Sequence, residues 1–460
     1  MTLPPIRSQH EPSTSPSAQS GSALQSLGKF ARQHVKLLRQ LGWHQFVKCL
    51  QIPFDTTDDL ASIPHPAAPY LRTLATHGVP APSHSPPWTK QQLQTVLNRG
   101  AHVSAKRLYR EFLFEDILDM VQKGYWTVLP FSAVQHLTHL KLSPAGVVPQ
   151  RSRRPRPIMD YSFTGVNPQS LPISPTHAMQ LGHTLPRLLQ SIAYADPTHG
   201  PPLLMKLDLA DGYYRVRLTP QAALELAVVL PGPGNSSYVG IPLCLPMGWT
   251  HSPPYFCAFT ETATDLANHA LLSNHPWTTT AHTLEEASQA AALPIMQSFS
   301  PTVIHPPTMR SQPPLGLVDV YIDDFIGVAQ QPVQQAVLRV MFHAISRIFR
   351  HDRHPDDNPN RKQTISASKL EKGDGCWSTT KTVLGWDIDT ARGILKLPQH
   401  KAERLVELLQ SFKGLTRTSR KKWYSLLGEL RYMSTAIKGT SYLFSILQSP
   451  LVQQPTASRI

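Results

Sequence analysis

Three aspartates of this chain end or interrupt apolar, β-forming segments. The motif Tyr321-Ile322-Asp323-Asp324 lies between two apolar runs, which predicts a tight hairpin that carries two neighbouring carboxylates. Asp208 ends a separate apolar run that begins at Leu203. Carboxylate oxygens on a rigid frame suit Mg²⁺ or Mn²⁺, and acids from separate strands permit two-metal phosphoryl transfer. Acidic pairs are also common in solvated turns, so the hairpin alone leaves both interpretations open.

The composition favours a polyanionic partner. The 460 residues carry a formal net charge of +14, and Lys and Arg occur throughout the chain. Nucleic acid is the leading candidate, although a basic protein of a membrane surface would have the same total charge. The four cysteines lack the spacing of a zinc site or of a dense disulfide framework. Because no apolar run approaches the length of a transmembrane span, we expect a soluble intracellular protein, in the cytoplasm or the nucleus, without a membrane partner.

The elements that must position these aspartates form an α+β pattern. The apolar run 203–207 predicts a strand, and a second strand is expected over 383–386. Helical spacing of apolar residues occurs before these strands over 113–121 and after the acidic hairpin over 338–349. Two further amphipathic helices are predicted over 405–412 and 423–430; these six segments are the main predictions of secondary structure. Strands in the middle with helices on both sides indicate an α+β fold.

Five short motifs follow one another along the chain. They are Arg156-Pro157-Ile158-Met159-Asp160-Tyr161, Lys206-Leu207-Asp208-Leu209-Ala210-Asp211-Gly212-Tyr213, Leu245-Pro246-Met247-Gly248-Trp249, Tyr321-Ile322-Asp323-Asp324 and Leu384-Gly385-Trp386. In this order they resemble the motifs of retroelement reverse transcriptases, over roughly residues 124–448. The resemblance implies an RNA-directed DNA polymerase of right-hand architecture, with fingers, a palm built from an antiparallel sheet plus helices, and a helical thumb. Both LTR and tyrosine-recombinase (DIRS-type) retrotransposons contain such a domain. The sequence of residues 426–431 resembles DIRS-type elements more than LTR elements.

The resemblance also implies a role for each matching residue. Asp208 and Asp323 match the metal-binding pair and Asp324 the neighbouring acid, so all three are predicted to be catalytic and to bind the metal. The predicted nucleotide-binding residues are Arg154, Arg156, Asp211, Gly212, Tyr213, Met247 and Gly248. The predicted primer grip consists of Leu384, Gly385 and Trp386.

Several of these assignments have a physical rationale and an open alternative. Tyr213 matches the aromatic gate whose ring leaves no room for a ribose 2′-hydroxyl, which favours dNTPs. The arginines near Arg156 suit phosphate oxygens, but they also fit a solvated basic loop. Lys369 lies near the place of a lysine proposed to protonate the pyrophosphate leaving group, and Lys362 and Lys372 are nearby alternatives.

The resemblance implies an order of domains along the chain. We expect a partly disordered, proline- and serine-rich N-terminal extension over 1–100, fingers over 101–202, a palm over 203–390, a thumb over 391–448 and a tail over 449–460. Met247 and Asp323 are 76 positions apart, which is longer than the family usually shows. The excess predicts a proline- and histidine-rich insertion within the palm at about 269–314.

The predicted activity is transfer of a nucleotidyl group from a dNTP to a primer 3′-hydroxyl, on an RNA or DNA template-primer duplex. A catalytically decayed or domesticated derivative that only binds nucleic acid is the alternative. The three aspartates argue against it, whereas the insertion argues for it. A third interpretation, an RNA-dependent RNA polymerase, shares the palm and is disfavoured mainly by Tyr213.

Overall fold

The computed structural model describes residues 20–51, 60–150, 153–172, 174–233, 237–289, 314–350, 358–434 and 442–453. Of the predicted N-terminal extension over 1–100, residues 1–19 and 52–59 lie outside this set, and so do residues 290–313 of the predicted insertion. The contacts divide the chain into two compact units. Unit 1 comprises Met1–Thr176, Asp211–Phe256 and Arg353–Lys362, and unit 2 comprises His177–Ala210, Cys257–Asp352 and Gln363–Ile460.

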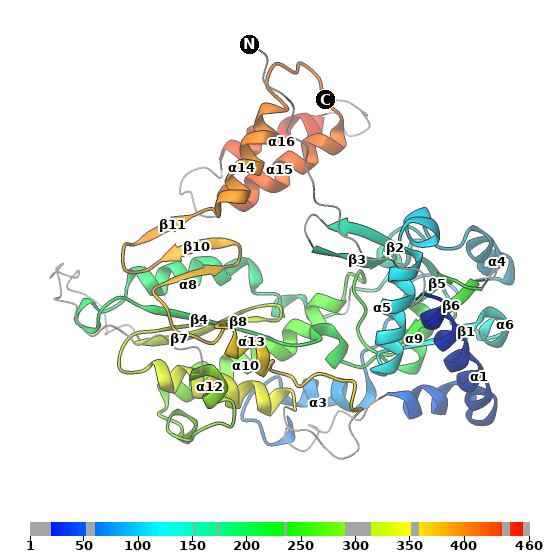
Figure 1. Ribbon diagram of the computed structural model, residues 1–460, viewed down its shortest axis with the longest axis horizontal. Helices are drawn as coiled ribbons and strands as arrows, with labels where there is room; N and C mark the ends of the chain where they lie inside the picture. The colour runs from blue at the N-terminus through cyan, green and yellow to red at the C-terminus, as the bar shows by residue number, and fades with distance from the viewer. Residues whose placement is uncertain are drawn as a thin grey trace, which may run out of the picture. The chain divides into compact units, whose positions relative to one another are not determined.

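Unit 1 is built on a five-stranded sheet. The strand order is β1 (Trp126–Pro130), β6 (Ser237–Pro242), β5 (Ala227–Pro231), β2 (Leu142–Gln150) and β3 (Arg153–Met159). The pair β2–β5 is parallel and the other pairs are antiparallel. The apolar side chains of β1 and β5 are buried, and α1 (Ser20–Leu50) and α5 (Arg110–Gln122) pack beside β1 (Figure 1). Burial of this apolar surface is the main source of stability for the unit.

The remaining helical segments of unit 1 are short. They are α3 (Ala68–His77), α4 (Lys90–Arg99), η1 (Ser104–Leu108), α6 (Phe131–Val134), α7 (Val166–Gln169), η2 (Thr176–Ala178, which extends into unit 2), η5 (Gly212–Arg215) and α9 (Pro220–Glu225). The helix predicted over 113–121 is confirmed as part of α5.

Unit 2 is built on a three-stranded antiparallel sheet. Its order is β4 (Leu203–Asp208), β8 (Asp324–Ala329) and β7 (Gly316–Tyr321), so that β8 is central. Helices α8 (Thr184–Ala193) and α12 (Gln334–Ile348) lie on opposite sides of this sheet (Figure 1). The period of two along a strand explains this arrangement, because alternate residues of β8 face alternate helices. The strand predicted over 203–207 is confirmed.

A second sheet of three strands joins this core. It contains β9 (Thr380–Val383), β10 (Trp386–Asp389) and β11 (Ile394–Lys396), in the order β11-β10-β9. One hydrophobic cluster combines residues of α8, of both sheets and of the β9–β10 hairpin, including Leu188, Ile326 and Trp386. The prediction of one strand over 383–386 is corrected, since a turn at Leu384 and Gly385 separates two strands there.

Helices complete unit 2. They are η3 (Leu181–His183), η4 (Pro197–His199), α10 (Ser252–Leu272, whose first turn belongs to unit 1), η6 (Pro276–Thr278), α11 (Glu285–Gln289), α13 (Ala367–Glu371), α14 (Gln399–Gln410), α15 (Arg420–Ser434) and α16 (Leu443–Gln453). The predicted helices over 405–412 and 423–430 correspond to α14 and α15.

The structure therefore confirms mixed helices and mainly antiparallel sheets. The two units follow other boundaries than the predicted fingers, palm and thumb, and that division stays a prediction. Among the described residues, helices long and apolar enough to cross a bilayer are absent.

Candidate active site

The strand register of unit 2 brings the three predicted carboxylates to one end of a sheet. Asp208 is the last residue of β4 and pairs directly with Asp324, the first residue of β8. Tyr321 pairs with Asp324 across the β7–β8 hairpin, which leaves Ile322 and Asp323 as the two turn residues. The backbone carbonyl of Asp323 also accepts a hydrogen bond of 3.0 Å from the amide of Leu209. The predicted tight hairpin is thus present.

The turn itself is strained. Ile322 has a φ of +61°, a conformation that β-branched residues rarely adopt and that costs on the order of 1–3 kcal/mol. A positive φ at the first of two turn residues is characteristic of type II′ hairpins, whose twist matches that of the strands. The strain persists only if the surrounding structure holds both strands firmly, and the contacts of β7 show how it does so.

Side chains of two helices satisfy the free edge of β7. The amide group of Asn268, on α10, donates to the carbonyl of Val318 at 2.8 Å and accepts from its N–H at 2.9 Å, as a neighbouring strand would. From α8, the hydroxyl of Thr184 donates to the carbonyl of Val320 at 2.8 Å. Edge strands normally expose these groups to water or to other chains, so the helices fix the strand that leads into the acidic turn.

A half-buried ion pair on β7 adds to this support. The guanidinium of Arg187 donates two hydrogen bonds of 2.6 Å to the carboxylate of Asp319, which is 2% exposed. Two parallel hydrogen bonds of this kind fix the orientation of the guanidinium as well as its distance from the carboxylate. Arg187 lies one turn after Thr184 on α8, so that one helix face holds two consecutive residues of β7.

The electrostatics of the three carboxylates are unfavourable without a cation. Burial, followed by the neighbouring Asp324 and Asp208, raises the pKa of Asp323 to about 6. The pKa of Asp324 is also raised, first by burial and then by Asp208, while Lys206 and Lys369 oppose the shift. Like charges directly across a strand pair repel each other. The Nζ of Lys369 contacts Oδ2 of Asp208 and compensates part of this charge.

The donor chemistry suits a hard divalent cation. Three carboxylates at one sheet end supply the oxygen ligands that Mg²⁺ and Mn²⁺ prefer. Burial and the neighbouring acids raise the pKa values of Asp323 and Asp324, so a bound cation would stabilise their charged forms. The described residues nevertheless contain no group of three or more His, Cys, Asp and Glu side chains arranged to hold a metal ion. The three side chains are of a suitable chemical type, and the strand register brings them to one end of the sheet. They do not form a complete coordination shell.

The predicted nucleotide-binding residues lie in unit 1. Asp211 has a φ of +63°, and its carboxylate accepts a hydrogen bond of 2.9 Å from the hydroxyl of Tyr125. Lys362 lies 3.9 Å from the same carboxylate. The backbone then bends at Gly212, and the Tyr213 ring meets the ring of Phe256 edge-on at 5.2 Å. Tyr213 is therefore a packed ring rather than a freely rotating one.

Two further predicted residues differ in their surroundings. Arg154 forms an ion pair of 3.4 Å with Asp116 and lies over the Phe112 ring, whereas Arg156 is exposed opposite Val148 on the hairpin of β2 and β3. Arg154 is thus already engaged with α5. Both side chains are exposed, and Arg154 would have to leave Asp116 to bind a ligand.

Met247 and Gly248 form a turn against the motif that contains Met159. Met247 is 44% exposed, and Gly248 has a φ of +98°. A Cβ at Gly248 would overlap the carbonyl oxygen of Met159, and Asn167 donates to the carbonyl of Gly248 at 3.0 Å. Only glycine fits this close approach of two backbones.

Two residues that sequence reasoning missed hold the predicted primer grip. The turn has positive φ values at Leu384 and Gly385, and the hydroxyl of Tyr432 donates to the carbonyl of Leu384 at 2.6 Å. The ring of Tyr432 stacks on Trp386 with 5.6 Å between centroids. Lys401 donates to the hydroxyl of Tyr432 at 3.1 Å and to the carbonyl of Gly385 at 3.3 Å.

These contacts fix the turn to α14 and α15. The polar groups of Lys401 and Tyr432 fill the space beside Gly385 so closely that a Cβ there would overlap both. No local sequence pattern marks the roles of Lys401 and Tyr432. A lysine and a tyrosine on amphipathic helices ordinarily belong to the solvated face or to the core.

We predict that Asp323→Asn stabilises the metal-free protein at neutral pH. The folded state holds the Asp323 proton more tightly than the unfolded state, because its pKa is raised to about 6, so wild type loses stability as the pH rises from about 4 to 6. Asparagine mimics the protonated acid and should increase the free energy of unfolding at pH 7 by on the order of 2 kcal/mol. Urea denaturation in a chelator at pH 4 and pH 7 measures the difference.

The gain should vanish at pH 4, and Asp196→Asn, at an exposed carboxylate, should show no gain at pH 7. Added Mg²⁺ should stabilise wild type more than the Asp323 variant. A variant that is no more stable than wild type at pH 7 would contradict the electrostatic description of the site.

We predict that Tyr432→Phe destabilises unit 2 by about 1 kcal/mol, because it removes the hydrogen bond to Leu384 and keeps the ring. Gly385→Ala should cost more, since the added Cβ meets Lys401 and Tyr432 at a positive φ. Tyr424→Phe, at a 54% exposed ring on the same helix, is the control and should change stability little. Equal effects of the two tyrosine variants in urea denaturation would rule out the proposed anchoring of the turn.

Comparison with known proteins finds structures of low sequence identity and low TM-score. No family model matches the chain, and no curated protein matches it. The similar solved structures include a foamy viral protease-reverse transcriptase and its dRH form, each in complex with double-stranded DNA. Both are 14% identical with a TM-score of 0.41, over 87% of this chain for the dRH form and 88% for the other. The chain spans 55% of the dRH structure's length and 67% of the other's. A likeness at this level does not by itself establish a shared fold.

Proposed function

We propose that this chain is an RNA-directed DNA polymerase, the reverse transcriptase of a retrotransposon. The observation that carries the proposal is the β4–β8 register, which sets Asp208 directly opposite Asp324 with Asp323 in the adjoining turn. This arrangement collects carboxylates from two strands, as two-metal nucleotidyl transfer requires. The ordered motifs around these residues support the same activity, because each resembles a part of a polymerase with its own task.

The carboxylates would hold Mg²⁺ or Mn²⁺, which when bound activates the 3′-hydroxyl and stabilises the negative charge of the phosphates. In the reaction, a bond forms between the 3′-oxygen of the primer and the α-phosphorus of the dNTP. The bond from that phosphorus to the pyrophosphate oxygen breaks, the hydroxyl gives its proton to water, and pyrophosphate gains a proton. Lys369 contacts Asp208, and its ammonium is the group of this site that we assign to supply the proton to pyrophosphate.

Residues of unit 1 would bind the nucleotide in this proposal. The exposed Arg156 guanidinium would contact the triphosphate, and Asp211, Gly212, Met247 and Gly248 would line the nucleotide. Arg154 contributes less, since Asp116 already holds it.

A basic surface of unit 2 would bind the template-primer duplex, RNA or DNA. Arg417, Lys421 and Lys422 are exposed on and before α15. Basic side chains of this kind contact phosphates without reading sequence. The net charge of +14 agrees with such a partner.

We expect wild type to extend a DNA primer on an RNA template with dNTPs and Mg²⁺, and Asp208→Asn and Asp323→Asn each to lower kcat at least a hundredfold. The physical reason is the loss of a charged oxygen ligand at the metal. Asp196→Asn is the matched control, because it makes the same chemical change at an exposed carboxylate of the same unit.

Primer-extension gels and steady-state rates provide the measurement. If wild type fails to extend, or if Asp323→Asn extends as well as wild type, the polymerase proposal is wrong. Salt-dependent RNA binding without extension would instead favour the alternative of a decayed, nucleic-acid-binding derivative.

We expect Tyr213→Val to raise ribonucleotide incorporation relative to deoxyribonucleotide incorporation at least tenfold. The smaller side chain would leave space for the 2′-hydroxyl, while Phe256 keeps its place beside it. Single-nucleotide extension with dNTP and rNTP gives the two values of kcat/KM. Tyr194→Val, at an exposed tyrosine, is the control; unchanged discrimination in the Tyr213 variant would remove that residue from the gate.

A further inference from the structure

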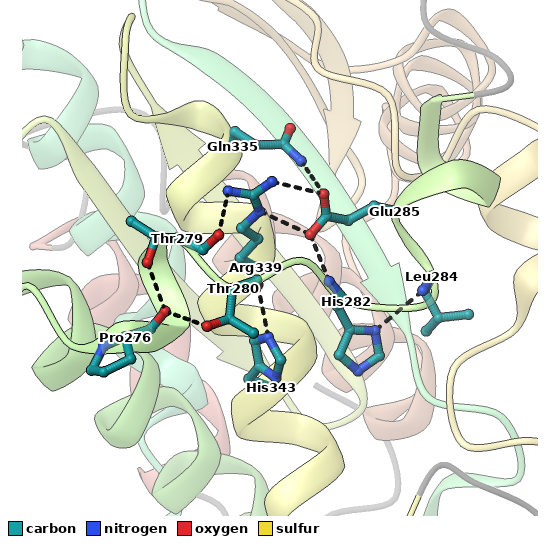
Figure 2. Close-up of polar contacts among 9 residues, drawn as sticks. All are labelled: Pro276, Thr279, Thr280, His282, Leu284, Glu285, Gln335, Arg339 and His343. Carbon is teal, nitrogen blue, oxygen red and sulfur yellow. Dashed lines mark hydrogen bonds and ion pairs between the residues drawn. The ribbon is translucent and has the colours of Figure 1, made fainter.

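The described part of the predicted insertion packs on α12. Figure 2 shows Arg339 of α12 between Glu285 of α11 and the carbonyl of Thr279. Arg339 donates to the two carboxylate oxygens of Glu285 at 2.9 and 3.2 Å, and to Thr279 at 3.0 Å. Gln335 donates to the same carboxylate at 2.7 Å. Glu285 is 8% exposed, so this is a half-enclosed charge pair with additional hydrogen bonds rather than a surface ion pair.

The contact continues along one face of α12. His343 lies one turn after Arg339, is hydrogen-bonded to the carbonyl of Thr280 at 3.0 Å, and stacks on the Trp277 ring at 5.9 Å. His282 is hydrogen-bonded to the hydroxyl of Ser346 at 3.1 Å. Side chains spaced by four residues share one helix face, so the segment 275–289 follows α12 over about three turns.

The other end of the segment contacts α13. Helix α11 packs against α13, and the hydroxyl of Ser288, which is 3% exposed, donates to the carbonyl of Gly375 at 3.1 Å. A Cβ at Gly375 would lie 2.8 Å from the side chain of Leu370 and 2.9 Å from that of Ser288. Because the packing is this close, a displacement of α11 would also displace α13.

Helix α13 carries the lysine of the candidate active site. Lys369 precedes the buried Leu370, and its Nζ contacts the carboxylate of Asp208. The loop after α13 is also tied to β4, because the amide of Lys206 donates to the carbonyl of Asp374 at 3.1 Å. Lys369 is thus placed by two supports, β4 on one side and the segment 275–289 on the other.

We propose that residues 275–289 brace α13 against α12 and thereby position Lys369 at Asp208. This inference rests on the proposed polymerase function for its catalytic consequence, but its structural part does not. Glu285, Ser288 and Arg339 are positioning residues, since none of them contacts the carboxylates. Residues 275–289, the part of the insertion on which this inference rests, then support the active site.

The structural part is tested by the reactivity of Lys369 in the full chain. An amine held by a carboxylate must break that contact before it reacts, so brief acetylation followed by peptide mass spectrometry reports its position. Ser288→Ala and Arg339→Gln should raise the labelling rate of Lys369 at least threefold relative to the exposed Lys396. Arg404→Gln, which breaks the ion pair with Glu429 on α14 and α15, is the control and should not.

Ser288→Ala removes a single oxygen, so it keeps the test valid if Arg339→Gln unfolds. Unchanged labelling of Lys369 in folded Ser288→Ala protein would overturn the brace, whether or not the protein is a polymerase. Absence of extension by wild type would overturn the polymerase proposal and leave the labelling result to decide the brace.

The catalytic part is tested by a double-mutant cycle. Ser288→Ala should lower kcat about fivefold or more with little change in KM for the dNTP, because substrate contacts are elsewhere. In a Lys369→Leu background the same change should have no further effect, since the group that it positions is gone. A further fall of similar size in that background would show a general loss of structure and would overturn the proposal.

Discussion

Two antiparallel strands that end on aspartates directly opposite each other set like charges side by side, and the surrounding structure has to hold them there. The pairing of Asp208 with Asp324 follows from the register of β4 and β8, and Asp323 adds a third carboxylate in the turn. Burial and mutual repulsion raise the pKa of Asp323 to about 6. A fold that keeps this arrangement gives up stability at neutral pH, which is characteristic of a site selected for chemistry rather than for stability.

The support comes from contacts that fix strands rather than from the carboxylates. Asn268 acts as a substitute strand along the edge of β7, and Thr184 and Arg187 hold the next two residues of the same edge. These bonds allow Ile322 to keep a positive φ in a turn of two residues. On the other side of the site, Lys369 compensates part of the charge. Rigid strands and a strained turn thus hold carboxylates whose charge Lys369 offsets in part.

Helices far along the chain control the two loops that approach this sheet. Tyr432 and Lys401 fix the turn at Leu384 and Gly385, so that α14, α15 and the β9–β10 hairpin move together. The segment 275–289 fixes α13 to α12 in a similar way. In both cases a helix face supplies side chains to a backbone that has little regular structure of its own. Such contacts transmit a displacement because protein interiors are closely packed.

Local patterns in the sequence determined the residues with chemistry and most of the elements that carry them. The acidic hairpin, the strand that ends on Asp208 and the helices α5, α12, α14 and α15 follow from apolar periodicity, which depends on neighbouring residues only. Periodicity failed at Leu384 and Gly385, where positive φ values turn one predicted strand into two.

Only the tertiary structure decided the partners. The register that pairs Asp208 with Asp324 depends on packing across the sheet. Lys369 contacts Asp208 while Lys362 lies near Asp211, which distinguishes the predicted lysine from one of its two alternatives. Asn268, Tyr432 and Arg339 gained roles through bonds to residues that are about 50 positions away in the chain. No local pattern encodes such contacts, because they form when distant segments bury their apolar faces against each other.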